Sequence, residues 1–256
     1  MNRDKHPKAL IISGFDPSGG AGLIADIETV HALGCRASAV ITCQTIQTEW
    51  DATACVASDS SWFRQQLHSI LKAYSFSVIK IGLTPSLEII EILAHALPSV
   101  SCPIVLDPII AAGGGYPFCN AKTIAHLSEK LIPLCDLATP NAEELRRLAG
   151  TSDDGVKSLL ERGCKAVLVS SEYERAGYLY HNLYSLHHPP HTFTAKRLPH
   201  RYHGSGCTLA SAIAAYLAHG KALVEAVRHA QEFTSHCLSI ASLSKSRVAV
   251  PNRFKQ

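Results

Sequence analysis

The 256-residue sequence has little net charge and no long apolar run. A formal net charge of +3 and a charged fraction of 18% fit neither a disordered chain nor a nucleic-acid-binding surface. No stretch approaches the roughly 18 consecutive apolar residues that a membrane helix needs. The start, MNRDKHPKALIISGFDPSGG, lacks the apolar core and the cleavage site of a secretory signal. We therefore expect a soluble, cytoplasmic protein that has neither nucleic acid nor membrane as a partner.

Cysteine pairs with the spacing of metal ligands are also missing. The sequence has nine cysteines, an odd number, and no CxxC pair, which argues against a disulfide framework and against a zinc ribbon. We expect most of these thiols to be reduced and buried. His187, His188 and His191 cluster around two prolines, and this favours an exposed loop or sheet edge over a metal site.

Short apolar runs alternate with helical patterns over most of the chain. The runs read ALIIS, ASAVIT, SVIKIGL, CPIVLD, DLATP and KAVLVS, and the intervening patterns predict helices over Ala21–Leu33, Trp62–Tyr74, Leu87–Leu97, Lys122–Leu131 and, in pieces, Ala142–Arg162. This alternation predicts an α/β fold of three layers, with a mostly parallel sheet and helices on both faces. Gly177–Lys196 breaks the alternation and predicts an antiparallel edge of two or three strands. Helices over Cys207–Ala218 and Leu223–Leu243 close the chain, and the absence of repeats or linkers predicts a single domain over residues 1–256.

Four loops follow predicted parallel strands at the ends where open α/β sheets bind ligands. They read SGFDPSGGAG, TCQTIQT, DPIIAAGGGYPF and TPNAEE. The glycine-led helix at Gly204 would have to join them in space to complete a site.

Glycines open two of the predicted helices, in DPSGGAG and in GSGCT. Glycine lets the backbone approach a ligand closely, and the free amides of a helix start attract anionic oxygens. A turn before a helix explains one such loop equally well, but two of them favour a phosphate or another polar ligand. No GK[ST] follows either loop and neither has the third glycine of a dinucleotide fingerprint, so phosphoryl transfer would need a different design.

Three kinds of side chain near these loops can carry chemistry. Cys207 stands in the first turn of a helix, where neighbouring amides favour a thiolate that accepts a proton; the alternative is an ordinary buried cysteine. Asp107 ends the fourth strand. Asn141 and Glu144 are three residues apart and can hold a hydrated Mg²⁺, although a capping box explains the same pair and is favoured by the residues alone.

Several motifs together resemble the hydroxymethylpyrimidine and phosphomethylpyrimidine kinases of thiamin biosynthesis, in the ribokinase-like superfamily. They read SGFDPSGGAGLIADIETVHALG, VITCQTIQT, KIGL, VLDPII, TPNAEEL and HGSGCTLASAIAAYLAHG, and they run from about Leu10 to Phe233. The most specific are DPSGGAG followed by AD, and GSGCT, which resembles the family's GTGCT. The resemblance implies a ribokinase-like fold and an enzyme that moves the γ-phosphoryl group of ATP onto a hydroxymethylpyrimidine and then onto its monophosphate.

The resemblance also implies roles on the transfer side. Cys207 corresponds to the family's base. The backbone amides of Gly204, Ser205, Gly206 and Cys207 form an anion hole for the charge that spreads over the transferred phosphoryl group.

On the substrate side, the family recognises the pyrimidine with a glutamine that follows the second strand. The alignment through VIT puts this residue at Gln47, with Gln44 as the less favoured choice. Asp16 and Gly20 would lie beside the substrate on the first loop. Leu83 would pack where the family often has methionine.

On the nucleotide side, the resemblance implies ATP and Mg²⁺ as cofactors. Asp107 and Glu144 would serve the metal, and Asn141 and Ser170 would lie by the nucleotide. Ser170 begins a departure, because the family's Lys-Gly-Gly-His is replaced here by Ser-Ser-Glu-Tyr. A lost cation and the added Glu172 predict weaker triphosphate binding.

Positive charge can come instead from Lys196, Arg197 or Arg201. Two other functions remain open: a vitamin kinase that acts on pyridoxal or a similar heterocycle, and a non-catalytic heterocycle-binding protein on the kinase scaffold. The superfamily commonly dimerises, and we expect a homodimer.

Overall fold

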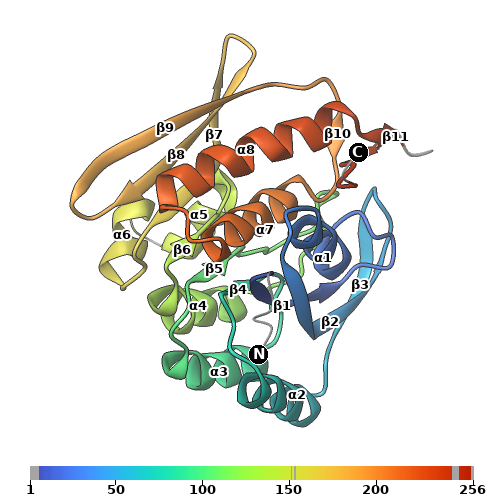
Figure 1. Ribbon diagram of the computed structural model, residues 1–256, viewed down its shortest axis with the longest axis vertical. Helices are drawn as coiled ribbons and strands as arrows, with labels where there is room; N and C mark the ends of the chain where they lie inside the picture. Colours follow the sequence, from blue (N-terminus) through green and yellow to red (C-terminus); the bar gives the residue numbers. More distant parts are fainter. Residues whose placement is uncertain (1–5, 151, 153, 244–247, 255–256) are drawn as a thin grey trace.

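The computed structural model describes residues 6–150, 152, 154–243 and 248–254. Its main sheet has nine strands in the order β3-β2-β1-β4-β5-β6-β7-β8-β9 (Figure 1). Their bounds are β1 Lys8–Phe15, β2 Arg36–Gln47, β3 Ala52–Ala57, β4 Val78–Ile81, β5 Ile104–Leu106, β6 Leu137–Ala138, β7 Val167–Arg175, β8 Tyr178–Ser185 and β9 His188–Lys196. Six neighbouring strands, in the order β2-β1-β4-β5-β6-β7, are parallel. Strand β3 at one edge and β8 and β9 at the other pair antiparallel with their neighbours. The expected mostly parallel sheet with an antiparallel edge at Gly177–Lys196 is confirmed.

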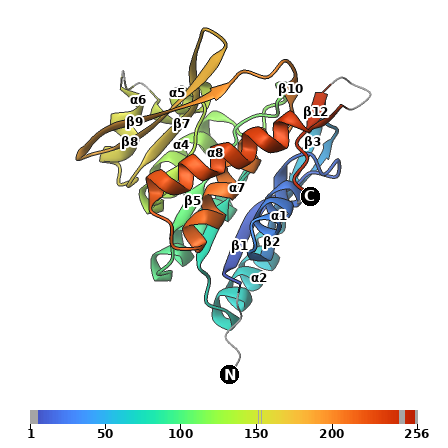
Figure 2. The same ribbon diagram turned by 45° about the horizontal axis from the view of Figure 1, so that its top comes forward.

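Helices cover both faces of this sheet. They are α1 Gly22–Ala32, α2 Ser60–Ala73, α3 Leu87–Ala96, α4 Ala121–Lys130, α5 Ala142–Ala149, α6 Gly155–Glu161, α7 Ser205–Ala218 and α8 Leu223–Ser239, with 3-10 turns at Leu97–Ser99 and Ile132–Leu134. Figures 1 and 2 show α1, α7 and α8 together on one face. The other face carries α2 to α6.

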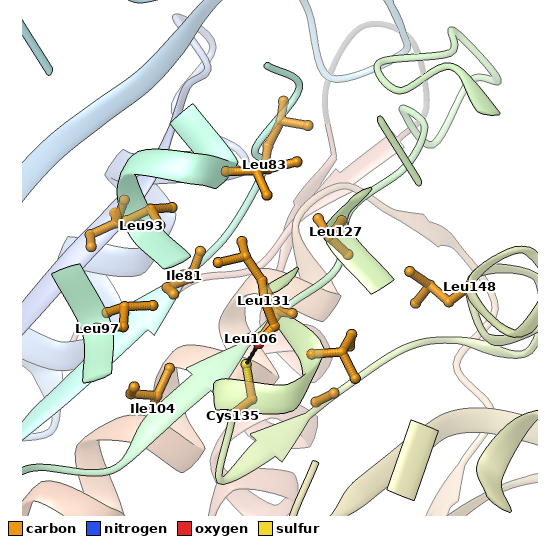
Figure 3. Close-up of a cluster of buried hydrophobic side chains, with 14 of the residues drawn as sticks. Ile81, Leu83, Leu93, Leu97, Ile104, Leu106, Leu127, Leu131, Cys135 and Leu148 are labelled. Atoms are coloured by element: carbon orange, nitrogen blue, oxygen red, sulfur yellow. Dashed lines mark hydrogen bonds between the residues drawn. The ribbon is translucent and has the colours of Figure 1, made fainter. Parts of the chain in front are cut away.

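Each face of the sheet has its own apolar core, because neighbouring residues of a strand point to opposite faces. In β1, Leu10 and Ile12 pack with α2 to α6, whereas Ala9 and Ile11 pack with α1, α7 and α8. Figure 3 shows part of the first core, where side chains of β4 and β5 meet those of α3 and α4. One sheet therefore joins the two cores, and it fixes the loops at its carboxyl edge.

The structure departs from the sequence predictions at two places. Strand β2 extends to Gln47, so all of TCQTIQT except Thr48 is strand rather than loop. Strand β3, which was not predicted, pairs with this extension and satisfies its backbone hydrogen bonds. A small sheet of β10 (Arg201–Tyr202), β12 (Val248–Val250) and β11 (Ser242–Leu243) was also not predicted. Strands of two or three residues carry too few residues for a periodic pattern.

Other expectations can be compared directly. All nine cysteines are free, and seven of them are buried. His188 and His191 lie in the exposed edge strand β9, and His187 is an exposed neighbour, as expected for a loop or sheet edge. In the part of the chain that the structure describes, no helix is both long and apolar enough to cross a membrane.

Candidate active site

The carboxyl ends of the parallel strands meet the start of α7 at a cavity of about 180 Å³. Loop residues after β1, β5 and β6 line it together with β2, β7 and the first turn of α7. The residues named from the sequence that line it are Asp16, Gln47, Leu83, Asp107, Asn141, Glu144, Ser170, Gly204, Ser205, Gly206 and Cys207. Gly20 is the exception. Gln47 lines the cavity from the end of β2, whereas Gln44 is exposed and does not.

The first turn of α7 offers unpaired backbone N–H groups to this cavity. Gly204, the residue before the helix, has a left-handed φ of 84°, and no side chain caps the helix. The first N–H groups of a helix have no partner inside it, so those of Ser205, Gly206 and Cys207 are available to a ligand. By contrast, α2 to α6 each begin with an Asp, Asn or Ser side chain that accepts one of these hydrogen bonds. The expected anion hole is therefore geometrically possible at GSGCT.

The first glycine loop is different, because the amides of Ser18, Gly20 and Ala21 already donate within the loop. The carboxylate of Asp16 accepts hydrogen bonds from the N–H groups of Ser18 (2.9 Å) and Ala21 (3.0 Å), and Ser18 Oγ accepts one from Gly20. These amides are not available to a ligand, but α1, which begins at Gly22, has no side-chain cap either, so the anion site in DPSGGAG stays a prediction. The Asp16 carboxylate accepts the hydrogen bonds that a bound anion would otherwise accept from Ser18 and Ala21.

His203 connects this first loop to GSGCT. Its Nε2 lies 2.7 Å from Asp16 Oδ2 and 3.5 Å from Gln47 Nε2. Burial raises the pKa of Asp16, but hydrogen bonds from His203 and Ser18 outweigh this effect and hold the pKa below its ordinary value. Gly20 packs behind the cavity: a Cβ there would overlap the His203 ring, so Gly20 shapes the loop rather than touching a ligand.

A buried group of charges lies beneath the cavity. Lys80 Nζ is 2.8 Å from both carboxylate oxygens of Asp26 and 3.8 Å from Asp107 Oδ2, and the Lys80 side chain is fully buried. Ser211 of α7 donates a further hydrogen bond to Asp26. Burial favours a neutral lysine, but the negative charge of Asp26 and its neighbours keeps the pKa of Lys80 above its ordinary value. Sequence reasoning gave Lys80 and Asp26 no role, although both lie in the quoted motifs KIGL and AD.

Cys207 is more protonated than the sequence predicts. Its side chain is buried, and burial together with the negative charge of Asp107 raises the pKa of the thiol far above its ordinary value, against the opposite effect of Lys80. The expectation that the helix amides favour a thiolate in the unliganded protein is therefore wrong. It overlooked the negative charge of Asp107, which acts on the buried thiol across the fold.

Asn141 and Glu144 form a complete capping box at the start of α5. Asn141 Oδ1 accepts from the Glu144 N–H, and the Glu144 carboxylate accepts from the Asn141 N–H, both at 2.9 Å. The capping interpretation is confirmed, and the pair still lines the cavity. Burial and the nearby Asp107 raise the pKa of Glu144 to about 8. Burial also raises the pKa of Asp107, whose Oδ2 lacks a hydrogen-bond partner.

A second cavity, of about 430 Å³, opens beside the first. Its walls come from β7 to β9, the segment between β9 and α7, and α8. The two cavities share six lining residues: Gly113, Asn141, Ser170, Tyr202, Ser205 and Gly206. A ligand in each cavity would therefore meet the other at the first turn of α7.

The Ser-Ser-Glu-Tyr segment lies at the edge of the second cavity, in a bulge of β7. Ser170 and Ser171 line the cavity, and Ser171 has a left-handed φ of 49°, a backbone conformation that favours glycine. Glu172 lines neither cavity. Its carboxylate accepts hydrogen bonds from Asn182 (2.6 Å) and Tyr184 (3.0 Å). Glu172 is therefore held outside both cavities, and weaker triphosphate binding stays a prediction.

Comparison with known proteins gives the family. The sequence profile of the phosphomethylpyrimidine kinases matches residues 16–252. The chain belongs to the phosphomethylpyrimidine kinase family. A hydroxymethylpyrimidine/phosphomethylpyrimidine kinase of Streptomyces coelicolor is 31% identical over 240 residues, which cover 91% of this chain and 89% of that protein.

Two other similar proteins are a longer, bifunctional enzyme and a pyridoxal kinase of known structure. The chloroplastic thiamine biosynthetic bifunctional enzyme of Arabidopsis thaliana is 31% identical over 91% of this chain, and the chain spans about half of that protein (47%). A pyridoxal kinase of Bacillus subtilis, solved as an ADP complex, superposes with a TM-score of 0.86 at 25% identity over 97% of both chains. The expected ribokinase-like fold is confirmed.

Proposed function

We propose that this member of the phosphomethylpyrimidine kinase family transfers the γ-phosphoryl group of ATP to the hydroxymethyl group of 4-amino-5-hydroxymethyl-2-methylpyrimidine, and then to the resulting monophosphate. The observation that most supports this proposal is that two cavities meet at the uncapped start of α7. Phosphoryl transfer needs two ligands placed end to end and fixed dipoles aimed at the transferring group, and this junction supplies both. A protein that only binds a heterocycle has no use for the second cavity.

In this proposal the smaller cavity takes the pyrimidine. Gln47 and Asp16 offer polar groups to the ring, and Leu83 offers an apolar contact. The amides of Ser205, Gly206 and Cys207 receive the negative charge of the transferring phosphoryl group.

The larger cavity takes the nucleotide. Its lining includes Lys196, the last residue of β9, and Arg197 and Arg201, which lie between β9 and α7. Arg197 is paired with Glu174, and Arg201 donates to the Gly113 carbonyl, whereas Lys196 has no such ion pair among the described contacts. We infer that Lys196 supplies the cation that Ser170 does not.

Mg²⁺ fits the residues at the junction. Within the described residues no three His, Cys, Asp or Glu side chains form a closed metal cage, but Mg²⁺ usually takes one or two carboxylates and completes its shell with phosphate oxygens and water. Asp107, whose Oδ2 accepts no hydrogen bond, and Glu144 both line the cavity and can offer carboxylate oxygens to the ion. When bound, the ion would neutralise charge on the phosphates.

Cys207 is the proposed base for the hydroxymethyl proton. Its thiol must first lose a proton, and this loss is opposed by burial and by the negative charges of Asp107 and Asp26. Neutralising Asp107 therefore moves the Cys207 pKa toward the range in which a base works. The positive charge of Lys80, which lies beneath the cavity, also lowers the pKa of Cys207.

The decisive experiment follows product formation by mass spectrometry with Mg-ATP, using the pyrimidine and pyridoxal in parallel. We expect mono- and diphosphate products from the pyrimidine, and a loss of at least about 100-fold in kcat for Cys207→Ala, as for removal of a general base. Cys35→Ala is the matched control, because Cys35 is equally buried but remote from both cavities. Absence of product with folded protein would refute the kinase, and a preference for pyridoxal would reassign its substrate.

We further propose that the chain is one domain and acts as a homodimer. A single sheet contributes to both cores, which supports the first statement. Exposed apolar side chains on the β2–β3 edge, those of Ile46 and Val56, support the second.

A further inference from the structure

Arg253, close to the end of the chain, is almost completely buried. Its exposed fraction is 2%, and its guanidinium group reaches three acceptors on different elements. Nη2 donates to the Gly20 carbonyl (2.6 Å), Nε donates to Thr208 Oγ1 (2.8 Å), and Nη1 lies 3.2 Å from the carboxylate of Glu28. The side chain thus joins the first glycine loop, α7 and α1. Arg253 is one residue beyond the part of the chain that matches the family profile.

The acceptors of Arg253 control the direction of the site's amides. Thr208 Oγ1, which accepts from Arg253, donates in turn to the Gly204 carbonyl at 2.8 Å. In a trans peptide the C=O and the following N–H point in opposite directions. The Gly204 carbonyl also accepts the N–H of Thr208 at 2.9 Å, and the two bonds together hold it so that the N–H of Ser205 faces the cavity. On the first loop, the Gly20 carbonyl is held in the same way, opposite the Ala21 N–H that donates to Asp16.

The two glycine loops touch at this point, with no room for a side chain. A Cβ on Gly204 would overlap the Gly20 carbonyl oxygen and approach Arg253 Nη2 to 2.8 Å. The relative position of the loops thus depends on the Arg253 guanidinium group, which contacts both of them.

The segment that carries Arg253 is itself anchored. Strand β12 pairs with β10, and Ala249 accepts a hydrogen bond from the N–H of His203, the residue before Gly204. Asn252 donates its N–H to the Cys237 carbonyl in α8. The backbone just before the anion hole and α8 are therefore both tied to residues 248–253, and these bonds hold the segment that carries Arg253 in place.

We propose that Arg253 is a positioning residue for phosphoryl transfer: its guanidinium group fixes the two glycine loops against each other and orients the α7 amides for the transferring phosphoryl group. This inference rests on the proposed kinase function. An arginine suits the task because its planar fork can donate in several fixed directions at once, whereas a lysine presents one compact head group. The Glu28 contact neutralises the buried charge, and the two loop contacts do the positioning.

The test compares Arg253→Met, Arg253→Lys and Glu28→Gln with Phe254→Ala, whose side chain is 73% exposed. We expect Arg253→Met to lower kcat by roughly 10- to 100-fold while the KM for the pyrimidine stays within about 3-fold, because the amides act mainly in the transition state. Arg253→Lys should recover only part of kcat. Glu28→Gln should stay within about 3-fold of wild type, since both loop contacts remain.

Hydrogen exchange of the unliganded protein gives a readout that does not depend on activity. We expect faster exchange in peptides that cover residues 14–25 and 199–212 of Arg253→Met and, less strongly, of Arg253→Lys, with no change in Phe254→Ala. Unchanged exchange in both loops together with unchanged kcat would overturn the proposal, as would full rescue by lysine. If Arg253→Met does not fold, the lysine variant decides. If the wild-type protein has no kinase activity, the proposed function fails, and the exchange rates still decide whether Arg253 holds the loops.

Discussion

At the scale of single residues, the buried pair Lys80–Asp26 predicts a large loss of stability on mutation. Lys80→Met leaves Asp26 and Asp107 without their cation in a site closed to water. Removing one partner of a buried ion pair typically costs about 3–5 kcal/mol, so we expect a decrease of this size in the free energy of unfolding. Urea denaturation measures it.

An exposed pair provides the control for Lys80. Lys165 Nζ lies 2.6 Å from Asp136, closer than Lys80 lies to Asp26, but the Lys165 side chain is 76% exposed. Lys165→Met should cost less than about 1 kcal/mol, because water screens exposed charges. Equal losses in the two variants would contradict the argument that burial, rather than distance, sets the cost.

His181 predicts a loss of stability in acid. Its Nδ1 accepts a hydrogen bond from the Ser171 N–H and its Nε2 has no partner, so the ring is buried and neutral. Burial lowers the pKa of His181 to about 4, against 6.5 in the unfolded chain. Between these values the unfolded chain binds a proton that the folded protein does not. Stability is therefore complete above pH 6.5 and falls as the pH decreases toward 4, by roughly 3 kcal/mol at most.

Urea denaturation of His181→Gln at about pH 7 and about pH 4.5 tests this prediction. Glutamine can still accept from Ser171 but does not titrate, so the variant should lose clearly less stability than wild type over this range. His188→Gln, at an exposed position, should behave like wild type. A wild-type pH dependence in His181→Gln would assign the acid sensitivity to other groups.

The residue scale also shows how far the sequence could predict the site. Positions inside local motifs, such as Gly204, Gln47 and Asn141, line the cavity as expected. The protonation of Cys207 was not predictable from its own neighbours, because Asp107 and Lys80 set its pKa across the fold. The role inferred for Arg253 had no signal, since an isolated arginine near a chain end predicts exposure.

At the scale of elements, the start of α7 predicts a separation of stability from activity. Nothing lies within 4 Å of a Cβ placed on Gly206, and this residue lines both cavities. Gly206→Ala should fold normally, with stability unchanged or raised by up to about 1 kcal/mol, because alanine is the better helix former. The methyl group would occupy space that the phosphoryl group needs, so we expect kcat/KM for ATP to fall by about 10-fold or more.

Gly204→Ala is the contrasting variant. Here the left-handed backbone and the overlap with the Gly20 carbonyl should lower the free energy of unfolding by about 2 kcal/mol or more. Thermal or urea unfolding and steady-state kinetics on the same preparations separate the two effects. Parallel losses of stability and activity in Gly206→Ala would show that this glycine serves folding rather than ligand binding.

Element types were more predictable than element lengths. The parallel strands and α1 to α8 follow from alternating apolar and helical patterns, which are local. The extension of β2 to Gln47 was not predicted, because it is stabilised by pairing with β3. Gln44 and Ile46 are exposed, so their side chains give no signal of a buried strand. Local sequence thus predicts where such a strand begins, whereas pairing with a tertiary neighbour decides where it ends.

At the scale of the whole molecule, one edge of the sheet is left open. Strand β3 is the last strand at its edge, on the right of the molecule in Figure 1, and its backbone can pair with a further strand. Val56 of β3 and Ile46 of β2 point to the same face, because Gln44 pairs with Val56 and Ile46 with Ala54. Their exposed fractions are 69% and 68%. Apolar side chains on an open edge are costly in water, and a second copy of the chain would cover them.

Light scattering coupled to size-exclusion chromatography tests the proposed homodimer. We expect a molar mass twice that of the chain for wild type, and the mass of one chain for Val56→Lys, because a charge on an edge strand prevents pairing. Leu186→Lys is the control: Leu186 is 55% exposed but lies in the turn between β8 and β9, at the opposite edge of the sheet, and the variant should remain dimeric. A wild-type monomer would refute the dimer outright, whereas a dimer in all three proteins would place the interface elsewhere. Because Gln47 ends the same strand that carries Ile46, dissociation in Val56→Lys should also raise the KM for the pyrimidine while leaving the KM for ATP within about 3-fold.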